Sequence, residues 1–232
     1  PSSSVVQHHG SSVNPQRQAG PHAHCIAVDS ANHRVFACDL GLDKVMIYRL
    51  NETNGALTAD ENPWVELKPG SGPRHIAFSP DGRHAYVISE MVSTLTTFAY
   101  DPENGTLKDE QTVSTLLENF HGKNTCAELV VHPTGKFVYG SNRGDDSIAV
   151  FAVDESTGRL QFVERQSTRG KTPRGFAIDP TGQYLIAANQ DSDSVVVFRI
   201  NAQTGRLTWT GQTIEVGQPV CVVFVPMEAA AP

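Results

Sequence analysis

Short apolar segments alternate with turn residues along the whole chain, and four of these segments superimpose. They start at four anchor residues, Ile26, Ile76, Leu129 and Phe176. Each anchor begins an apolar strand that runs into a turn, for example Pro-Asp-Gly or Pro-Thr-Gly. Each unit also carries a turn glycine at one fixed distance from its anchor, at Gly55, Gly105, Gly158 and Gly205. A period of roughly 50 residues with such a constant register indicates a repeat protein.

Within each unit the pattern predicts four short strands and no helix. β-branched and aromatic runs such as Tyr86–Ile88 and Val195–Phe198 are bounded by turn residues, and a more polar strand such as Leu160–Glu164 follows the turn glycine. Four-stranded units with this period are typical of a β-propeller. We therefore predict an all-β propeller with about four and a half blades, in which the apolar first strands line the central channel.

The repeat predicts a single propeller domain over residues 1–232. We expect residues 1–19 to end a preceding blade, blades at 20–71, 72–124, 125–171 and 172–217, a closing strand at 218–226 and a tail at 227–232. A lone first strand is expected to complete a blade begun at the other end of a longer chain. Because the chain also starts at Pro1, we interpret it as N-terminally truncated.

Composition narrows the range of partners. The chain has 232 residues, and 18 Lys and Arg against 25 Asp and Glu give a formal net charge of −7, which disfavours nucleic acids and anionic membranes. No run approaches the roughly 20 apolar residues of a membrane span. The four cysteines form no Cys-x-x-Cys pair, so we expect them to be buried and reduced in a cytoplasmic protein.

Charged residues concentrate where the repeats differ from one another. Two residues before the anchors stand His24, Arg74, Ala127 and Arg174. If Asp81 and Gly82 form a two-residue hairpin loop, Arg74 lies opposite Ser89 and diagonal to Glu90. Around the ring this predicts one channel mouth lined by His22, His24, Arg74, His75, Glu90, Glu128, Arg143 and Arg174. Several arginines at one mouth suit a small anion that carries phosphate or carboxylate.

Less specific interpretations of the same residues stay open. Arg74 and Glu90 could be an ion pair that only satisfies the end of a blade. His22 and His24 could lie on one face of a strand and bind a metal, but two histidines do not complete a site. We therefore predict no metal and no cofactor. Three further histidines near hairpin turns are expected to be exposed: His33, His84 and His132.

Several segments resemble the lactonase family of seven-bladed β-propellers. They are His9–Gln18, Gly20–His24, Gly72–Gly82, Tyr86–Glu90, Asn124–Glu128, Gly140–Phe151 and Thr172–Phe176. The family includes a bacterial 6-phosphogluconolactonase and a fungal 3-carboxy-cis,cis-muconate lactonizing enzyme. The resemblance implies a seven-bladed ring with N-terminal blades that this chain lacks. It also implies four catalytic positions, which fall on His22 or His24, Arg74, Glu90 and Arg174.

The expected activity is hydrolysis of a sugar-acid lactone such as 6-phosphogluconolactone. His22 or His24 would act as base on water, Arg74 and Arg174 would hold the phosphate or the oxyanion, and Glu90 would orient the histidine or protonate the leaving oxygen. The expected substrate contacts are His75, Asn124, Glu128, Asn142 and Arg143. Two alternatives stay open: muconate cycloisomerisation at the same residues, and a non-catalytic propeller that serves as a binding scaffold. The missing blades leave open whether this chain is active by itself.

Overall fold

A computed structural model describes residues 3–225, which form four antiparallel sheets of four strands each. The first sheet contains β1 (Ala23–Val28), β2 (Arg34–Asp39), β3 (Lys44–Asn51) and β4 (Ala56–Glu66). The second contains β5 (Pro73–Phe78), β6 (His84–Ser89), β7 (Thr94–Asp101) and β8 (Thr106–Ser114). The third contains β9 (Thr125–Val131), β10 (Phe137–Arg143), β11 (Ser147–Val153) and β12 (Leu160–Ser167). The fourth contains β13 (Pro173–Ile178), β14 (Tyr184–Asn189), β15 (Ser194–Ile200) and β16 (Leu207–Glu215).

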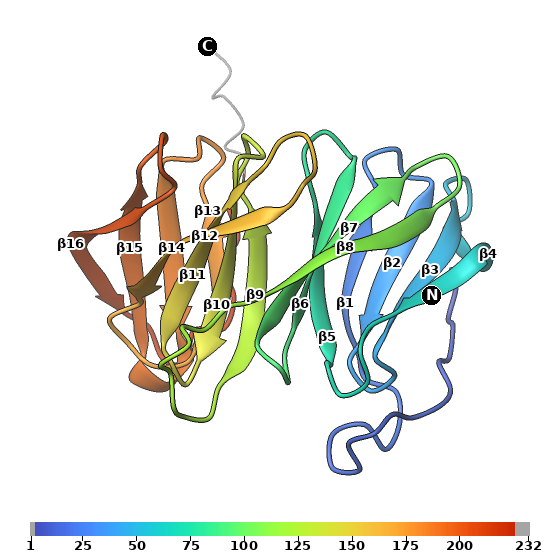
Figure 1. The fold of residues 1–232 in the computed structure, drawn as a ribbon, viewed down its shortest axis with the longest axis horizontal. Helices are drawn as coiled ribbons and strands as arrows, with labels where there is room; N and C mark the ends of the chain where they lie inside the picture. Colours follow the sequence, from blue (N-terminus) through green and yellow to red (C-terminus); the bar gives the residue numbers. More distant parts are fainter. Residues whose placement is uncertain (1–2, 226–232) are drawn as a thin grey trace.

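The four sheets stand side by side as consecutive blades (Figure 1). The first strands of neighbouring blades contact one another, β1 with β5, β5 with β9 and β9 with β13. They therefore share the inner side of the arc, and the fourth strands lie outside, as β8 and β12 do on the near side of Figure 1. Within residues 3–225 the one helical element is a short 3-10 turn, η1 (Gln190–Ser192). The predicted all-β architecture of propeller blades is confirmed.

Apolar side chains fill the spaces between adjacent blades. The second strand of a blade contributes to both of its faces, because successive side chains of a strand point to opposite sides. Val87 on β6 packs toward the first blade with Phe36, whereas Tyr86 packs toward the third blade with Val138. A third cluster fills the space between the last two blades and includes Tyr139 and Phe198. Each blade thus depends on its neighbours for its core.

The two end blades each have a face without a neighbouring sheet. Ile26 on β1 and Ile214 on β16 are accordingly exposed. The sequence predicts a closing strand at 218–226, but the described residues 216–225 contain no strand. A strand needs a partner ladder, and this segment instead lies against the first strand of its own last blade, where a Cβ on Gly175 would meet the carbonyl oxygen of Val220. Residue 226 and the predicted tail 227–232 lie outside the described residues.

The expected state of the cysteines is confirmed only in part. All four thiols are free, and Cys38 and Cys126 are buried. Cys25 is partly buried, and Cys221 is exposed because it lies in the C-terminal segment on the open side of the last blade. The expectation of burial was therefore wrong for Cys221.

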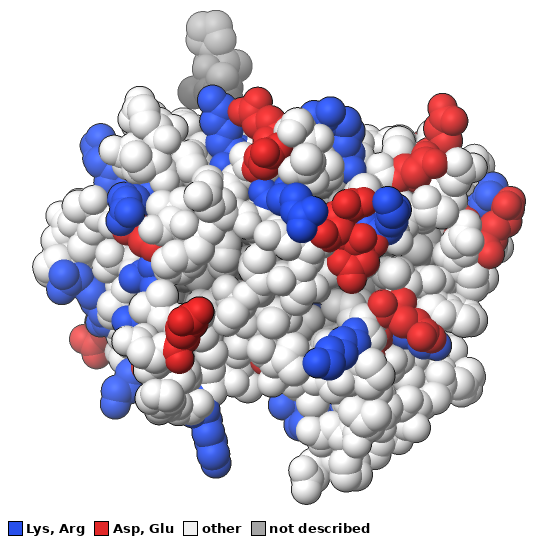
Figure 2. Space-filling model, viewed as in Figure 1, with Lys and Arg blue, Asp and Glu red and all other residues white. Residues whose placement is uncertain are grey.

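Charged side chains of both signs are interspersed over the face of the molecule that Figure 2 shows. Acidic and basic side chains also form exposed ion pairs, for example Arg49 with Glu61 and Arg206 with Glu164. Among the described residues, no helix is both long enough and apolar enough to cross a membrane.

Candidate active site

A β-bulge at the start of β5 places Arg74 at the end of the blade. The hairpin register holds along most of β5 and β6, where His75 pairs with Ile88, but Pro73 rather than Arg74 pairs with Ser89. The predicted pair of Arg74 with Ser89 is therefore wrong by one residue. A bulge inserts an unpaired residue and redirects its side chain, so Arg74 points away from the regular ladder.

The same irregularity recurs at the start of every first strand. The register shifts between Ala23 and Cys25 in β1 and between Pro173 and Gly175 in β13, which leaves His24 and Arg174 as the extra residues. In β9 the shift falls between the pairs of Cys126 and Leu129. The positions two residues before each anchor are therefore bulge positions.

Glu90 lies at the centre of a group of arginines that comes from three parts of the chain. Its Oε2 atom accepts hydrogen bonds from Arg74 Nε at 3.1 Å and pairs with Arg143 Nη2 at 3.0 Å. Its Oε1 atom accepts a hydrogen bond from Arg17 Nη2 at 2.7 Å. Arg74 is 3% exposed and Glu90 is 6% exposed, so this carboxylate is held in a largely dry environment where charge interactions are strong.

Both charges at this centre persist at neutral pH. Burial and the positive charge of Arg143 lower the pKa of Arg74 to about 10. Burial alone would raise the pKa of Glu90, but the hydrogen bond from Arg17 and the positive charges of Arg143, Arg17 and Arg74 outweigh it and hold that pKa below its usual value. Glu90 is therefore ionised at neutral pH and has no proton to give to a leaving oxygen.

A histidine and a second carboxylate lie beside Arg74. His75 Nδ1 lies 2.6 Å from Glu128 Oε1, and His75 Nε2 lies 3.0 Å from Arg74 Nη1. Because a guanidinium group only donates hydrogen bonds, Nε2 accepts from Arg74 and the ring proton is on Nδ1, where it is donated to Glu128. The carboxylate that orients His75 is therefore Glu128, whereas the sequence predicts that Glu90 orients His22 or His24.

His24 approaches this pair from the neighbouring blade. The rings of His24 and His75 are 5.2 Å apart and tilted by 48°. Loss of water from part of the His24 ring, together with the positive charge of Arg74, lowers the pKa of His24 to about 4. The rest of the residue is exposed, and among residues 3–225 its ring makes no hydrogen bond. His24 is thus a neutral imidazole with a free lone pair at pH 7.

His22 and Arg174 differ in their relation to this site. The backbone N–H of His22 donates to Asp39 Oδ1 at 2.8 Å, and its side chain is exposed. Arg174 is partly buried, and its guanidinium lies 3.5 Å from Gln190 Oε1. Its charge contributes to lowering the pKa of both His24 and Arg74, so Arg174 belongs to the same electrostatic group.

Two of the expected substrate contacts have a structural role. Asn142 is fully buried; its amide donates to Thr115 O at 3.1 Å, and its Oδ1 accepts from Thr115 Oγ1 at 2.7 Å. Asn124 donates to that same oxygen at 3.0 Å and to Ser93 Oγ at 2.9 Å. These amides tie the second and third blades together and have no free polar group to offer a substrate.

Arg17 is a further member of the group around Glu90, and the repeat does not predict it. It belongs to the non-repeating segment before the first blade, so no equivalent position in another blade marks it. The available signal was the segment His9–Gln18, which carries the family resemblance and contains Arg17. With Arg17 included, the group contains four arginines and the two carboxylates Glu90 and Glu128, so it has a surplus of two positive charges when its histidines are neutral.

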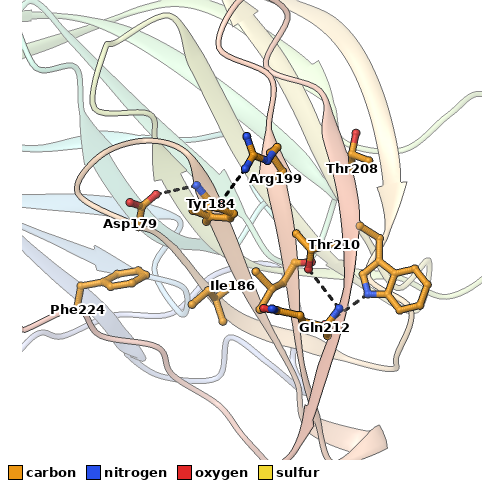
Figure 3. Close-up of a pocket in the computed structure, with 10 residues that line it drawn as sticks. Asp179, Tyr184, Ile186, Arg199, Thr208, Thr210, Gln212 and Phe224 are labelled. Carbon is orange, nitrogen blue, oxygen red and sulfur yellow. Dashed lines mark hydrogen bonds between the residues drawn. The ribbon is translucent and has the colours of Figure 1, made fainter.

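An open cavity of about 670 Å³ lies elsewhere, on the open face of the last blade. Its lining includes the apolar side chains of Trp209 and of Ile186 and Phe224, the last two of which are labelled in Figure 3. Its polar groups bond to one another, as Arg199 does to the hydroxyl of Tyr184 at 2.9 Å. This surface lacks the convergent charges of the bulge site. No group of three metal-ligating side chains occurs in the described part of the chain.

Comparison with known proteins agrees with the fold. The family model described as "Lactonase, 7-bladed beta-propeller" matches residues 1–224. The chain belongs to this lactonase family. A Bacillus subtilis 6-phosphogluconolactonase is 41% identical over 210 residues, which cover 90% of this chain and 59% of the relative. Other relatives of 36% identity, from Lactococcus lactis, are uncharacterised proteins.

Solved structures of family members share the fold. A putative 6-phosphogluconolactonase from Bacteroides fragilis superimposes with a TM-score of 0.89 at 35% identity, over 97% of this chain and 63% of that one. A periplasmic gluconolactonase from Pseudomonas aeruginosa superimposes with a TM-score of 0.85 at 39% identity, over 91% and 59%. The chain thus spans about three fifths of the length of these lactonase family members.

Proposed function

We propose that this chain carries the site of a lactonase that hydrolyses a sugar-acid lactone, with a phosphorylated lactone such as 6-phosphogluconolactone as substrate. One observation carries the proposal: Arg17, Arg74 and Arg143 converge on Glu90, with Arg174 in the same electrostatic group and a neutral, unpartnered His24 beside them. A positive, partly dry site suits an anionic substrate and the oxyanion that forms when water attacks its carbonyl carbon.

The geometry favours His24 as the general base. A base needs a free lone pair within reach of water. The Nε2 lone pair of His75 already accepts a hydrogen bond from Arg74, whereas the ring of His24 is unpartnered among the described residues. In the proposed reaction His24 takes a proton from water as the water oxygen bonds to the carbonyl carbon. It returns that proton to the ring oxygen as the C–O bond breaks, which yields the hydroxy acid.

The arginines have different tasks in this scheme. Arg74 is buried and fixed by Glu90 and by the Ala127 carbonyl oxygen, at 2.5 Å, so it acts as a permanent positive charge behind the reacting centre. Arg174 is more accessible and weakly held, and it is available to contact the oxyanion or another anionic group. Glu90 keeps the arginines in place and takes no part in proton transfer.

The names of the relatives favour hydrolysis over the alternatives. The proteins from Bacillus subtilis, Bacteroides fragilis and Pseudomonas aeruginosa carry lactonase names. A binding scaffold would not need a free histidine base beside a group of arginines. Cycloisomerisation of a muconate would use the same arginines to bind the carboxylates of its substrate, so the test includes a carboxymuconate.

The test is hydrolysis of 6-phosphogluconolactone by the purified chain, corrected for spontaneous hydrolysis, beside a carboxymuconate as second substrate. We expect lactone hydrolysis that falls about 100-fold or more in His24→Asn, a loss in the usual range for a general base, and that changes little in the matched variant His22→Asn. Loss in His22→Asn alone would transfer the role of base to His22. Turnover of the muconate alone would overturn the lactonase proposal.

A further inference from the structure

We infer that Arg17 is the residue that recognises the phosphate group of the substrate. The inference rests on the proposed function for the class of substrate, and it assigns a specificity role to a residue outside the repeats. Three arginines contact Glu90, and the contacts of Arg17 differ from those of the other two.

Arg74 and Arg143 are each held by a second bond to the backbone. Arg74 Nη1 donates to the Ala127 carbonyl oxygen at 2.5 Å, and Arg143 Nη2 donates to the Cys126 carbonyl oxygen at 2.8 Å. Their side chains are 3% and 15% exposed. These two guanidinium groups are therefore locked in place, and they fix Oε2 of Glu90 without help from Arg17.

Arg17 is the accessible member of the group. Its side chain is 48% exposed, and within residues 3–225 its guanidinium makes one contact, with Glu90 Oε1. A guanidinium group has five N–H donors in a planar fork that matches the oxygens of a phosphate. Most of the donors of Arg17 are therefore free for an incoming anion, while its backbone stays where it is.

The backbone beneath Arg17 is well anchored. The Arg17 N–H donates to Asn14 Oδ1 at 3.0 Å, and the neighbouring Gln18 is fully buried, with its amide bonded to the Leu40 carbonyl oxygen at 2.9 Å. Ser12 is tied to Asp43 at 2.6 Å. A fixed turn that carries an accessible arginine supplies a preformed anion contact, which costs little ordering when the ligand binds.

The position of Arg17 suits recognition of a distal group. The buried Arg74 and the base His24 mark the reacting centre, and Arg17 bonds to Oε1 of Glu90, whereas Arg74 bonds to Oε2. A phosphate at the far end of a sugar-acid lactone would meet Arg17 while the carbonyl carbon lies near His24. The residue thus distinguishes phosphorylated from unphosphorylated lactones.

The test is isothermal titration of the full 232-residue chain with 6-phosphogluconate and with gluconate, which differ only in the phosphate. We expect tighter binding of the phosphorylated acid by the unmodified chain. Arg17→Gln should weaken its binding about 10- to 100-fold, the range for a lost charge-assisted contact, with gluconate binding changed less than about twofold. Arg17→Lys should recover part of the loss. Arg83→Gln serves as the matched control, because Arg83 pairs with Asp81 at an exposed hairpin turn.

Three results would overturn the inference: equal binding of the two acids by the unmodified chain, unchanged phosphate preference in Arg17→Gln, or equal weakening of both acids in that variant. Hydrolysis is measured separately on the same proteins. If the chain binds 6-phosphogluconate through Arg17 but does not accelerate lactone hydrolysis, the proposed function fails and the phosphate contact stands. If hydrolysis occurs without a phosphate preference, only the role of Arg17 fails.

Discussion

Two buried arginines, Arg34 and Arg74, occupy opposite ends of the blades. The difference between their surroundings distinguishes an arginine that stabilises the fold from one that belongs to the candidate active site. Arg34 starts β2 at the hairpin end, where it bonds to Asp60 at 2.9 Å and to the Pro102 and Glu103 carbonyl oxygens of the next blade. Although burial acts in the opposite direction, the hydrogen bond and charge of Asp60 raise the pKa of Arg34.

Arg74 at the bulged end is 3% exposed, against 5% for Arg34, but its pKa is lowered to about 10. It shares one carboxylate with two other arginines, so burial and repulsion from Arg143 prevail over the attraction of Glu90. A buried charge that is fully matched indicates a link between blades. A buried charge in surplus, next to a neutral histidine, indicates a site for an anion.

The largest expected effect is on stability, at Arg34. Arg34→Met leaves Asp60 buried without its main partner, so we expect the free energy of unfolding to fall by about 3–5 kcal/mol, measured by urea denaturation. The control is Arg49→Met, because Arg49 also faces Asp60, at 3.4 Å, but is 52% exposed; its loss should stay below about 1 kcal/mol. Equal losses in the two variants would contradict a structural role specific to Arg34.

The same substitution at Arg74 should give the opposite pattern. Arg74→Met removes a charge that Arg143 repels, and Glu90 keeps Arg17 and Arg143 as partners, so we expect the free energy of unfolding to fall by less than in Arg34→Met. Lactone hydrolysis should fall about 100- to 1000-fold because an electrostatic group of the reacting centre is lost. A stability loss as large as that of Arg34→Met, with activity retained, would make Arg74 a structural residue like Arg34.

The smallest expected effect is on the titration of His24. Its pKa of about 4 means that the ring stays neutral as the pH falls through 6.5, so its NMR signals should titrate with a midpoint near 4. In Arg74→Met the midpoint should move up toward 6.5, because removal of a positive charge favours the protonated ring. A midpoint near 6.5 in the unmodified chain would contradict the electrostatic coupling between His24 and Arg74.

The same lowered pKa has a consequence for stability. The unfolded chain binds a proton at His24 below about pH 6.5, whereas the folded chain binds it only near pH 4. The contribution of His24 to stability is therefore present above pH 6.5 and is lost as the pH falls toward 4.

The repeat predicted the blades well because it reflects the packing of strands. The first-strand anchors and the turn glycines have constant spacing, and every strand from β1 to β16 lies within the predicted blade ranges. The bulges were not predicted, because an extra residue in a strand leaves the apolar pattern after it unchanged. The pattern located His24, Arg74 and Arg174, and the bulges explain where their side chains go.

Contacts between blades account for other differences. His84 and His132 lie next to hairpin turns and were expected to be exposed, but both are buried, because turn glycines of the following blade pack on them. His132 Nε2, for instance, lies 2.9 Å from the Gly182 carbonyl oxygen. Arg17 was missed for a related reason: its partner Glu90 is 73 residues away, and periodicity holds no information on such a contact.

The most direct test of the account is to locate the ligand by NMR. Titration of the isotopically labelled chain with 6-phosphogluconate should shift the amide signals around His24, Arg74, Glu90 and Arg174. Signals around Tyr184, Trp209 and Phe224, at the cavity on the open face of the last blade, should stay unchanged. Shifts confined to that cavity, or none at millimolar ligand, would contradict the assignment of the bulged strand ends as the anion site.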